Sequence, residues 1–147
     1  MKSNLKIPIY AINPLYGIII FDWFVFLLKS IIKDNLINIY VIHNPAYKDI
    51  RKEDGPFLAK LSKKRIVDTI MNVKDVMVIG DYDMIKIFVV STQDITEDLQ
   101  EAFSKINIDI TMGATASVEN DTEFSILDRA IKAISLAQSK NINFQRL

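Results

Sequence analysis

Cysteine is absent from this chain of 147 residues, and glycine, proline and histidine are scarce. Without cysteine the chain can form no disulfide framework, no zinc-thiolate site and no thiol nucleophile. A surplus of one charge is also lacking, because 18 basic residues balance 18 acidic residues. This balance argues against nucleic-acid binding, which favours a basic excess, and against a disordered acidic chain. Because half of the residues are apolar, we expect one domain with one core over residues 1–147.

Long hydrophobic runs are missing as well. The most apolar stretch, Tyr16 to Leu28, has only 13 residues and contains Asp22, whereas a transmembrane helix needs about 20 residues. No small-residue cleavage site follows this stretch, so a secretory signal peptide is not indicated. The sequence therefore predicts a cytoplasmic protein without a membrane span.

Two apolar runs in the stretch Asp75 to Ser91 flank a short polar segment, Gly80-Asp81-Tyr82-Asp83. This pattern predicts a β-hairpin with a tight turn. The second run is apolar at nearly every position, which is typical of a central strand buried on both faces. The turn places the carboxylates of Asp81 and Asp83 at the edge of the sheet, where they could hold a divalent metal. Aspartate is also an ordinary turn residue, and we favour that interpretation.

The rest of the chain alternates between helical and extended patterns. We expect an extended arm or edge strand over residues 1–15, helices over 17–33 and 56–71, strands over 36–42, 106–117 and 141–144, a polar loop over 43–55, and further helices capped by Asp94 with Glu97 and by Asp121. The side chains expected to face the core are Leu58, Leu61, Ile66, Ile70, Leu99, Phe103, Phe124, Leu127, Ile131 and Ile134, with Ala130, Ala133 and Ala137 allowing close approach. This order predicts an α/β fold in which a mixed central sheet of about five strands has helices on both faces.

Short motifs occur in a fixed order along the chain: Asn13-Pro14-Leu15-Tyr16-Gly17, Tyr47-Lys48-x-Ile50 followed by Gly55, Ile110-Thr111-Met112, the three alanines of the last helix, and Asn143. In this order they resemble the Asp-Pro-Leu-Thr-Gly, Phe-Lys-x-Ile, Val-Thr-Val, alanine-rich and Gly-Arg-Asn motifs of the GGDEF domain of diguanylate cyclases. These enzymes join two GTP molecules into cyclic di-GMP. The resemblance extends over residues 13–144 and implies the nucleotidyl-cyclase fold, which has a ferredoxin-like core.

The residues that the resemblance implies for catalysis are mostly replaced. The metal-binding Asp after the first core strand falls on His43, and a neutral imidazole is a poor ligand for Mg²⁺. The residues that read guanine fall on Arg51 and Lys60, neither of which can accept a hydrogen bond. The Gly-Gly-Asp-Glu-Phe signature aligns with residues 81–85 and keeps only Asp83, although a shift by one residue, which would match Gly80, stays open.

Further residues that the resembled family uses to bind phosphate and product are also replaced in this chain. The phosphate-binding Lys and Arg become Gln138 and Ile142, and the product-inhibition motif Arg-x-x-Asp begins with Asn72. Lys48 and Asp83 are the substrate and metal contacts that remain. The resemblance therefore implies a degenerate, catalytically inactive GGDEF-like domain without a cofactor, acting as an interaction or regulatory module in signalling. The alternative is a nucleotide or cyclic-dinucleotide sensor that binds through Lys48, Arg51, Lys60 and Asp83 without turnover, and an active diguanylate cyclase is the least favoured hypothesis.

Two polar features have an ordinary structural interpretation beside a functional one. His43 could be a switch or a transition-metal ligand, but a single histidine at a strand end is more often a polar cap. A basic cluster could surround an anionic ligand, whereas a solvated helix face is the interpretation we favour. The members of the cluster are Lys48, Arg51, Lys52, Lys60, Lys63, Lys64 and Arg65.

The first helix is apolar well beyond the stripe that packing on a sheet requires. The residues concerned are Ile20, Phe21, Trp23, Phe26 and Leu27. Exposed together, they would leave an apolar patch of a size that soluble monomers seldom tolerate. The sequence therefore predicts an interface through this helix, with a second copy or another protein. The alternative, that the arm from Leu5 to Ile12 folds back and covers the patch, stays open.

Overall fold

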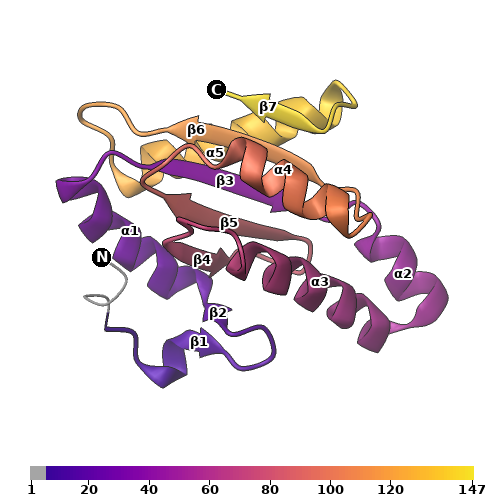
Figure 1. Ribbon diagram of the computed structural model, residues 1–147. Helices are drawn as coiled ribbons and strands as arrows, with labels where there is room; N and C mark the ends of the chain where they lie inside the picture. The colour runs from indigo at the N-terminus through magenta and orange to yellow at the C-terminus, as the bar shows by residue number, and fades with distance from the viewer. Residues whose placement is uncertain (1–5) are drawn as a thin grey trace.

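The computed structural model describes residues 6–147, which form one seven-stranded mixed sheet with helices on both faces (Figure 1). The strands are β1 (Ile12–Asn13), β2 (Ile18–Ile19), β3 (Asn38–His43), β4 (Val78–Asp81), β5 (Lys86–Ser91), β6 (Thr111–Ala116) and β7 (Phe144–Arg146). The helices are α1 (Phe21–Asp34), α2 (Tyr47–Asp54), α3 (Pro56–Met71), α4 (Thr96–Lys105) and α5 (Glu123–Ser139), and a 3₁₀ turn covers Ile9–Ala11. The expected α/β class is confirmed.

The strands lie in the order β1-β2-β4-β5-β3-β6-β7, so β5 is central, as the sequence predicts. β4 and β5 form the expected antiparallel hairpin, and β3 runs antiparallel to both β5 and β6. The pairs β2 with β4 and β6 with β7 are parallel. Four of the five residues Ile87 to Ser91 are apolar and all five are buried, which confirms the expected two-sided burial of this strand.

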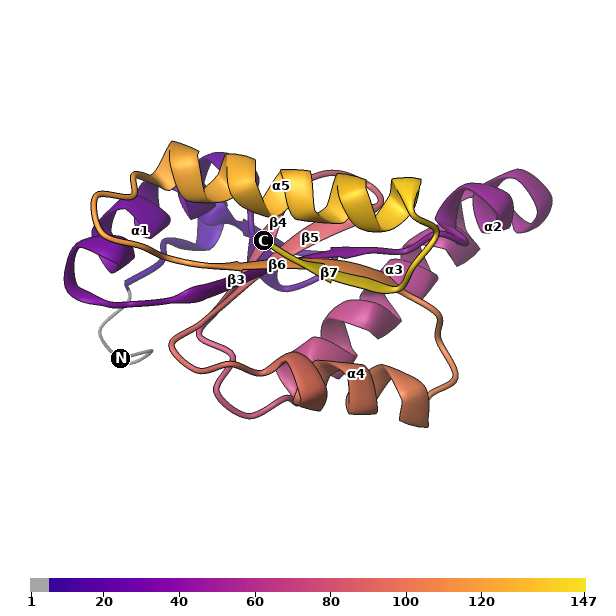
Figure 2. The ribbon, with the colours of Figure 1, turned by 90° about the horizontal axis from the view of Figure 1, so that it is seen from above.

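Four of the five helices form two layers, with α1 and α5 on one face of the sheet and α3 and α4 on the other (Figure 2). Successive side chains of a strand point to opposite faces. Accordingly, Tyr40 and Ile42 of β3 join the cluster under α3 and α4, whereas Ile39 and Val41 join the cluster under α1 and α5. The near-continuous apolar character of this strand follows from its cover on both faces.

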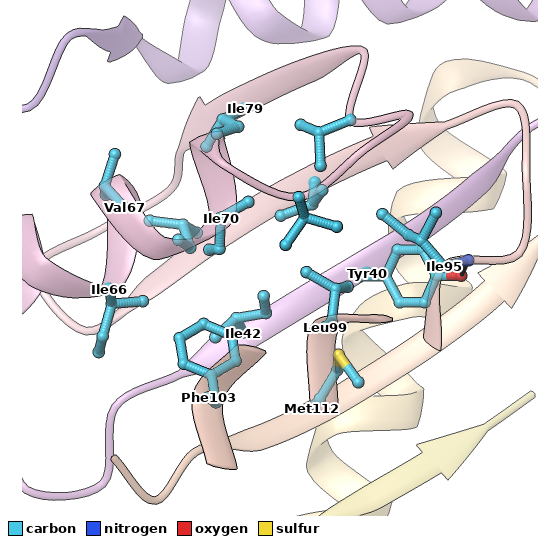
Figure 3. Packing of buried hydrophobic residues seen from close by; sticks show 14 of the residues in the cluster. Tyr40, Ile42, Ile66, Val67, Ile70, Ile79, Ile95, Leu99, Phe103 and Met112 are labelled. Atoms are coloured by element: carbon cyan, nitrogen blue, oxygen red, sulfur yellow. Dashed lines mark hydrogen bonds between the residues drawn. The ribbon is translucent and has the colours of Figure 1, made fainter. Parts of the chain in front are cut away.

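On one face of the sheet, buried side chains of β3, β4, β5 and β6 pack against α3 and α4 (Figure 3). Ile66 and Ile70 of α3 and Leu99 and Phe103 of α4 are buried as predicted. The buried Tyr40 hydroxyl accepts a hydrogen bond from the backbone N–H of Ile95 at 2.8 Å and donates one to Asp94 at 3.0 Å. The polar tip of this core residue therefore has partners at the start of α4.

The opposite layer depends on a close approach between β6 and α5. A Cβ atom on Gly113 would lie 2.3 Å from the backbone nitrogen of Ile134, so glycine is required where strand and helix meet. The facing residues Ala130, Ala133 and Ala137 are fully buried, as predicted from their spacing.

Several expected boundaries are wrong. The first helix begins at Phe21 rather than Gly17, because Ile18 and Ile19 form strand β2 after a turn in which Gly17 has a positive φ of 73°. The predicted polar loop over residues 43–55 contains helix α2, which buries Tyr47 alone among its own residues. The sheet has seven strands rather than about five, because the short β1 and β2 extend one edge.

Some predicted core positions and caps are wrong too. Leu58, Leu61 and Phe124 are 46%, 43% and 66% exposed, because α3 and α5 bury neighbouring stripes. Asp94 accepts hydrogen bonds from the Thr96 backbone N–H and hydroxyl rather than forming a capping box with Glu97. The residue that caps α5 is Thr122, whose hydroxyl accepts a hydrogen bond from the backbone N–H of Ser125.

The amino-terminal arm fits its predicted place at an edge of the sheet, since β1 pairs only with β2 among the described residues. Ile7 packs against the cluster under α1, and Leu5 lies outside the described residues. None of the helices within residues 6–147 combines the length and the apolar character that crossing a membrane requires.

Candidate functional site

The turn between β4 and β5 is built around the side chain of Asp83. Its Oδ1 accepts hydrogen bonds from the backbone N–H groups of Ile85 and Lys86, both at 2.8 Å. The N–H groups of Tyr82 and Asp83 donate to the carbonyl oxygen of Lys86. This is the local bonding by which Asp stabilises tight turns. The geometry supports the turn interpretation of Asp83.

Asp81 is engaged by a buried cation. The Lys63 ammonium group donates to Asp81 Oδ1 at 2.6 Å and to the carbonyl oxygen of Asp83 at 2.7 Å. It also lies 4.7 Å from the ring centre of Tyr16, within cation–π range. Asn13 Nδ2 donates to the other oxygen of Asp81 at 3.2 Å. We call Asn13, Tyr16, Lys63, Asp81 and the Asp83 carbonyl the Lys63 cluster.

The Lys63 cluster is well shielded from water. The Lys63 and Asp81 side chains are 6% and 19% exposed. Burial, followed by the neighbouring Tyr47 and Asp81, raises the pKa of Tyr16 to about 12. In such surroundings an ion pair is screened little, and removal of one partner leaves a costly unpaired charge. The cluster therefore fixes the position of the hairpin relative to α3 and to the turn between β1 and β2.

Lys63 is a residue that the sequence interpretation missed. The sequence pattern groups it with the basic cluster on a solvated helix face, yet it is only 5% exposed. The signal was available in the spacing, because Lys63 lies in line with Ala59, Ile66 and Ile70 on the buried stripe of α3. A lysine on an apolar stripe needs a partner of opposite charge, and Asp81 is that partner.

His43 lies at the end of β3, opposite Lys86 in β5 and Thr111 in β6. Its Nδ1 is buried and has no hydrogen-bond partner among the described residues. Burial, with the nearby Lys86 second, lowers the pKa of His43 below 6.5. Within residues 6–147 no group of three or more His, Asp or Glu side chains is placed to hold a metal ion.

The basic ligand candidates are exposed on two helices. Lys48 and Arg51 lie on α2 and Lys60 on α3, and Arg51 Nη1 approaches the sulfur of Met84 in the hairpin at 3.6 Å. A cleft of about 720 Å³ lies between α2, α3 and the residues around Ile108, but none of the three basic side chains lines it. The structure therefore places Arg51 beside the hairpin without bringing the three candidates together in this cleft.

The predicted interface residues of α1 divide into buried and exposed members. Ile20 and Phe26 are 38% and 62% exposed, whereas Leu27 is buried in the core and offers little surface to another chain. Phe21 packs against Tyr82 of the hairpin, with ring centres 5.2 Å apart. The exposed part of α1 is therefore centred on Phe26.

The side chain of Trp23 in α1 contacts the amino-terminal arm. Its ring is 5.2 Å from that of Phe26 and 6.0 Å from that of Tyr10. The arm thus reaches Trp23 while Phe26 stays exposed, and Tyr10 itself is 76% exposed. We call Tyr10, Ile20, Trp23 and Phe26 the α1 surface.

Comparison with known proteins identifies the fold. The sequence matches no family model and no curated protein. The structure matches the GGDEF domain of DgcB from Caulobacter crescentus, solved in complex with c-di-GMP, with a TM-score of 0.85 and 12% identity over 98% of this chain and 97% of that one. The FimX GGDEF domain from Pseudomonas aeruginosa matches with a TM-score of 0.79 and 11% identity over 93% of this chain and 99% of that one.

A third match is the diguanylate cyclase SiaD from Pseudomonas aeruginosa, solved in complex with its activator SiaC. Its TM-score is 0.75 and its identity 11%, over 92% of this chain and 60% of that one. The chain therefore has the GGDEF fold, which confirms the fold implied by its motifs. At this level of identity the likeness concerns the fold, and function has to be argued from the site.

Proposed function

We propose that this chain is a catalytically inactive GGDEF-like domain that acts as an interaction or regulatory module in signalling. The observation that carries the proposal is the ion pair between Lys63 and Asp81 at the hairpin. Metal-assisted phosphoryl transfer needs carboxylates that are free to bind cations and positive charges directed at the phosphates. At this hairpin, one carboxylate is neutralised by lysine and the other has an oxygen committed to the turn.

His43 supports the same proposal. It occupies the position of a metal-binding Asp in the resembled family, and burial together with Lys86 lowers its pKa, although the nearby Asp83 acts in the opposite direction. A neutral imidazole is a poor substitute for a carboxylate toward Mg²⁺.

The proposal is tested by incubating the protein with GTP and Mg²⁺ or Mn²⁺, beside an active diguanylate cyclase as positive control. We expect no cyclic di-GMP above the protein-free blank. Formation of product by the wild type, and its loss in Asp83→Asn, would contradict the proposal. The Asn variant is suited to this test because its Oδ1 can keep the turn bonds while the negative charge is removed.

The proposed working surface of the module is the α1 surface. Aromatic side chains are enriched at protein interfaces, and soluble monomers rarely leave several of them exposed side by side. Tyr10 and Phe26 are exposed on either side of the half-buried Trp23, and ring contacts join the three side chains. We infer that this group contacts a second copy of the chain or another protein.

Nucleotide sensing without turnover is the second candidate. The exposed side chains of Lys48 and Arg51 lie on the helix next to the hairpin, and Arg51 already reaches Met84. Exposed cations are able to attract phosphate groups. This function takes second place because the cleft between α2 and α3 is lined by none of these three cations and because Asp81 and Lys63 already satisfy each other.

A further inference from the structure

The metal that the GGDEF fold implies does not fit the hairpin of this chain. Oxygen atoms of the kind that Mg²⁺ prefers are present, namely the Asp81 carboxylate and the Asp83 carbonyl. Both oxygens instead accept hydrogen bonds from the Lys63 ammonium group, at 2.6 Å and 2.7 Å. A divalent cation at this point would meet a fixed positive charge in surroundings of low dielectric constant.

The bonding of Lys63 is nearly complete. An ammonium group has three N–H donors. Two of them are directed to oxygen atoms, and the face of the Tyr16 ring lies 4.7 Å from the nitrogen. The second oxygen of Asp81 is occupied by the Asn13 amide. The cluster therefore satisfies its own charges without an added ion.

The groups of the Lys63 cluster come from three separate parts of the chain. Asn13 and Tyr16 belong to β1 and the turn that follows it, Lys63 to the middle of α3, and Asp81 and Asp83 to the hairpin (Figure 1). A cation at their centre joins all three. In a site that depends on a bound metal, the same junction forms only when metal is present.

We propose that Lys63 is a tethered cation that takes the place of a bound metal at the hairpin, so that the domain holds this junction closed without metal. This inference rests on the proposed function, because it gives the inactive domain a permanently filled cation position. It predicts that loss of the ammonium group exposes a cation site made of Asp81 and the Asp83 carbonyl.

The test compares thermal unfolding in a chelator with thermal unfolding in millimolar Mg²⁺ or Ca²⁺. The wild-type midpoint is expected to be the same in both. Lys63→Ala is expected to unfold at a lower temperature in chelator and to gain a midpoint that rises with cation concentration, because the ion binds only the folded state. Adding Asp81→Asn to Lys63→Ala should abolish the rise.

The matched control is Lys64→Ala. Lys64 is the next residue of the same helix, and its pair with Asp68 is exposed to solvent. We expect this variant to unfold at the same temperature in chelator and in cation. The inference is overturned if the unfolding midpoint of the wild type rises with cation concentration as that of Lys63→Ala does. It is also overturned if Lys63→Ala folds but its midpoint does not change with cation concentration.

A second measurement needs no variant. Mn²⁺ broadens the NMR signals of nuclei close to its binding site. We expect no selective broadening of the Asp81 and Asp83 backbone amide signals in the wild type, and selective broadening there would overturn the inference. Failure of the proposed function is a separate result, since it appears as GTP turnover. A metal-binding but inactive wild type would refute the tethered cation alone.

Discussion

At the scale of single residues, the ion pair between Asp121 and Arg129 sets a pH dependence. Two guanidinium nitrogens donate to the two carboxylate oxygens at 3.0 Å and 2.7 Å, and Ser125 Oγ and the Val118 backbone N–H add further hydrogen bonds. These donors, Arg129 foremost, lower the pKa of Asp121 to about 2 from 3.8. The carboxyl group thus binds its proton more weakly in the folded state than in the unfolded state.

A group with a lowered pKa stabilises the fold above its unfolded pKa and loses that contribution as pH falls toward its folded pKa. For Asp121 the loss begins near pH 4 and continues to about pH 2. We expect it to amount to roughly 2 kcal/mol of the free energy of unfolding. When urea unfolding is measured across this pH range, the free energy of unfolding should decrease less steeply with falling pH for Asp121→Asn than for wild type. Equal slopes would contradict the prediction, and Asp68→Asn, whose ion pair is exposed, is the control.

Single residues also show where prediction from sequence is limited. Asp83 was correctly interpreted as a turn residue, because Asp in a short polar segment between two strands bonds to its own backbone. Lys63 was misplaced because its neighbours in the sequence are charged, and its partner Asp81 is 18 positions away. A long-range ion pair leaves no local pattern, whereas the apolar stripe on which Lys63 lies does.

At the scale of elements, the success of prediction follows the strength of local signals. The bounds of α3 were predicted correctly, since Pro56 at the first helical position follows Gly55 and an apolar stripe runs to Met71. Helix α2 was missed because it is almost entirely polar and buries Tyr47 alone among its own residues. Strand β2 was assigned to the first helix because Ile18 and Ile19 continue directly into the apolar residues of α1.

Helix α1 carries the prediction on association. We expect the wild type to have a mass above one chain in sedimentation equilibrium and Trp23→Ala with Phe26→Ala to release the single chain. The physical reason is the loss of two rings from the centre of the α1 surface. Phe26→Ala alone should weaken association without disturbing the core, because Phe26 is 62% exposed.

A matched control for these variants exists on other helices. Phe57 of α3 and Phe124 of α5 are 70% and 66% exposed, and replacing both by alanine removes two exposed aromatic rings that lie outside α1. The mass should then stay that of the wild type. If the mass is the same for all variants and the wild type, the α1 surface is not an interface between copies of this chain.

At the scale of the whole molecule, two candidate surfaces lie on different parts of the fold. The α1 surface belongs to one face of the sheet, and the exposed cations Lys48 and Arg51 belong to α2 at the hairpin end of the sheet (Figure 2). The fold itself was predictable because alternating helical and extended patterns and ordered motifs agree with each other. The function of each surface was not, since it depends on which exposed side chains a partner or ligand touches.

Thermal unfolding with nucleotides separates the two candidate functions. A ligand that binds only the folded state must raise the unfolding midpoint as its concentration passes the dissociation constant. For an interaction module we expect no shift with millimolar GTP or cyclic di-GMP, together with a mass above one chain. A saturable shift that disappears in Lys48→Ala with Arg51→Ala, but persists in a variant with Lys132→Ala on the exposed side of α5, would make nucleotide sensing the better account of this domain.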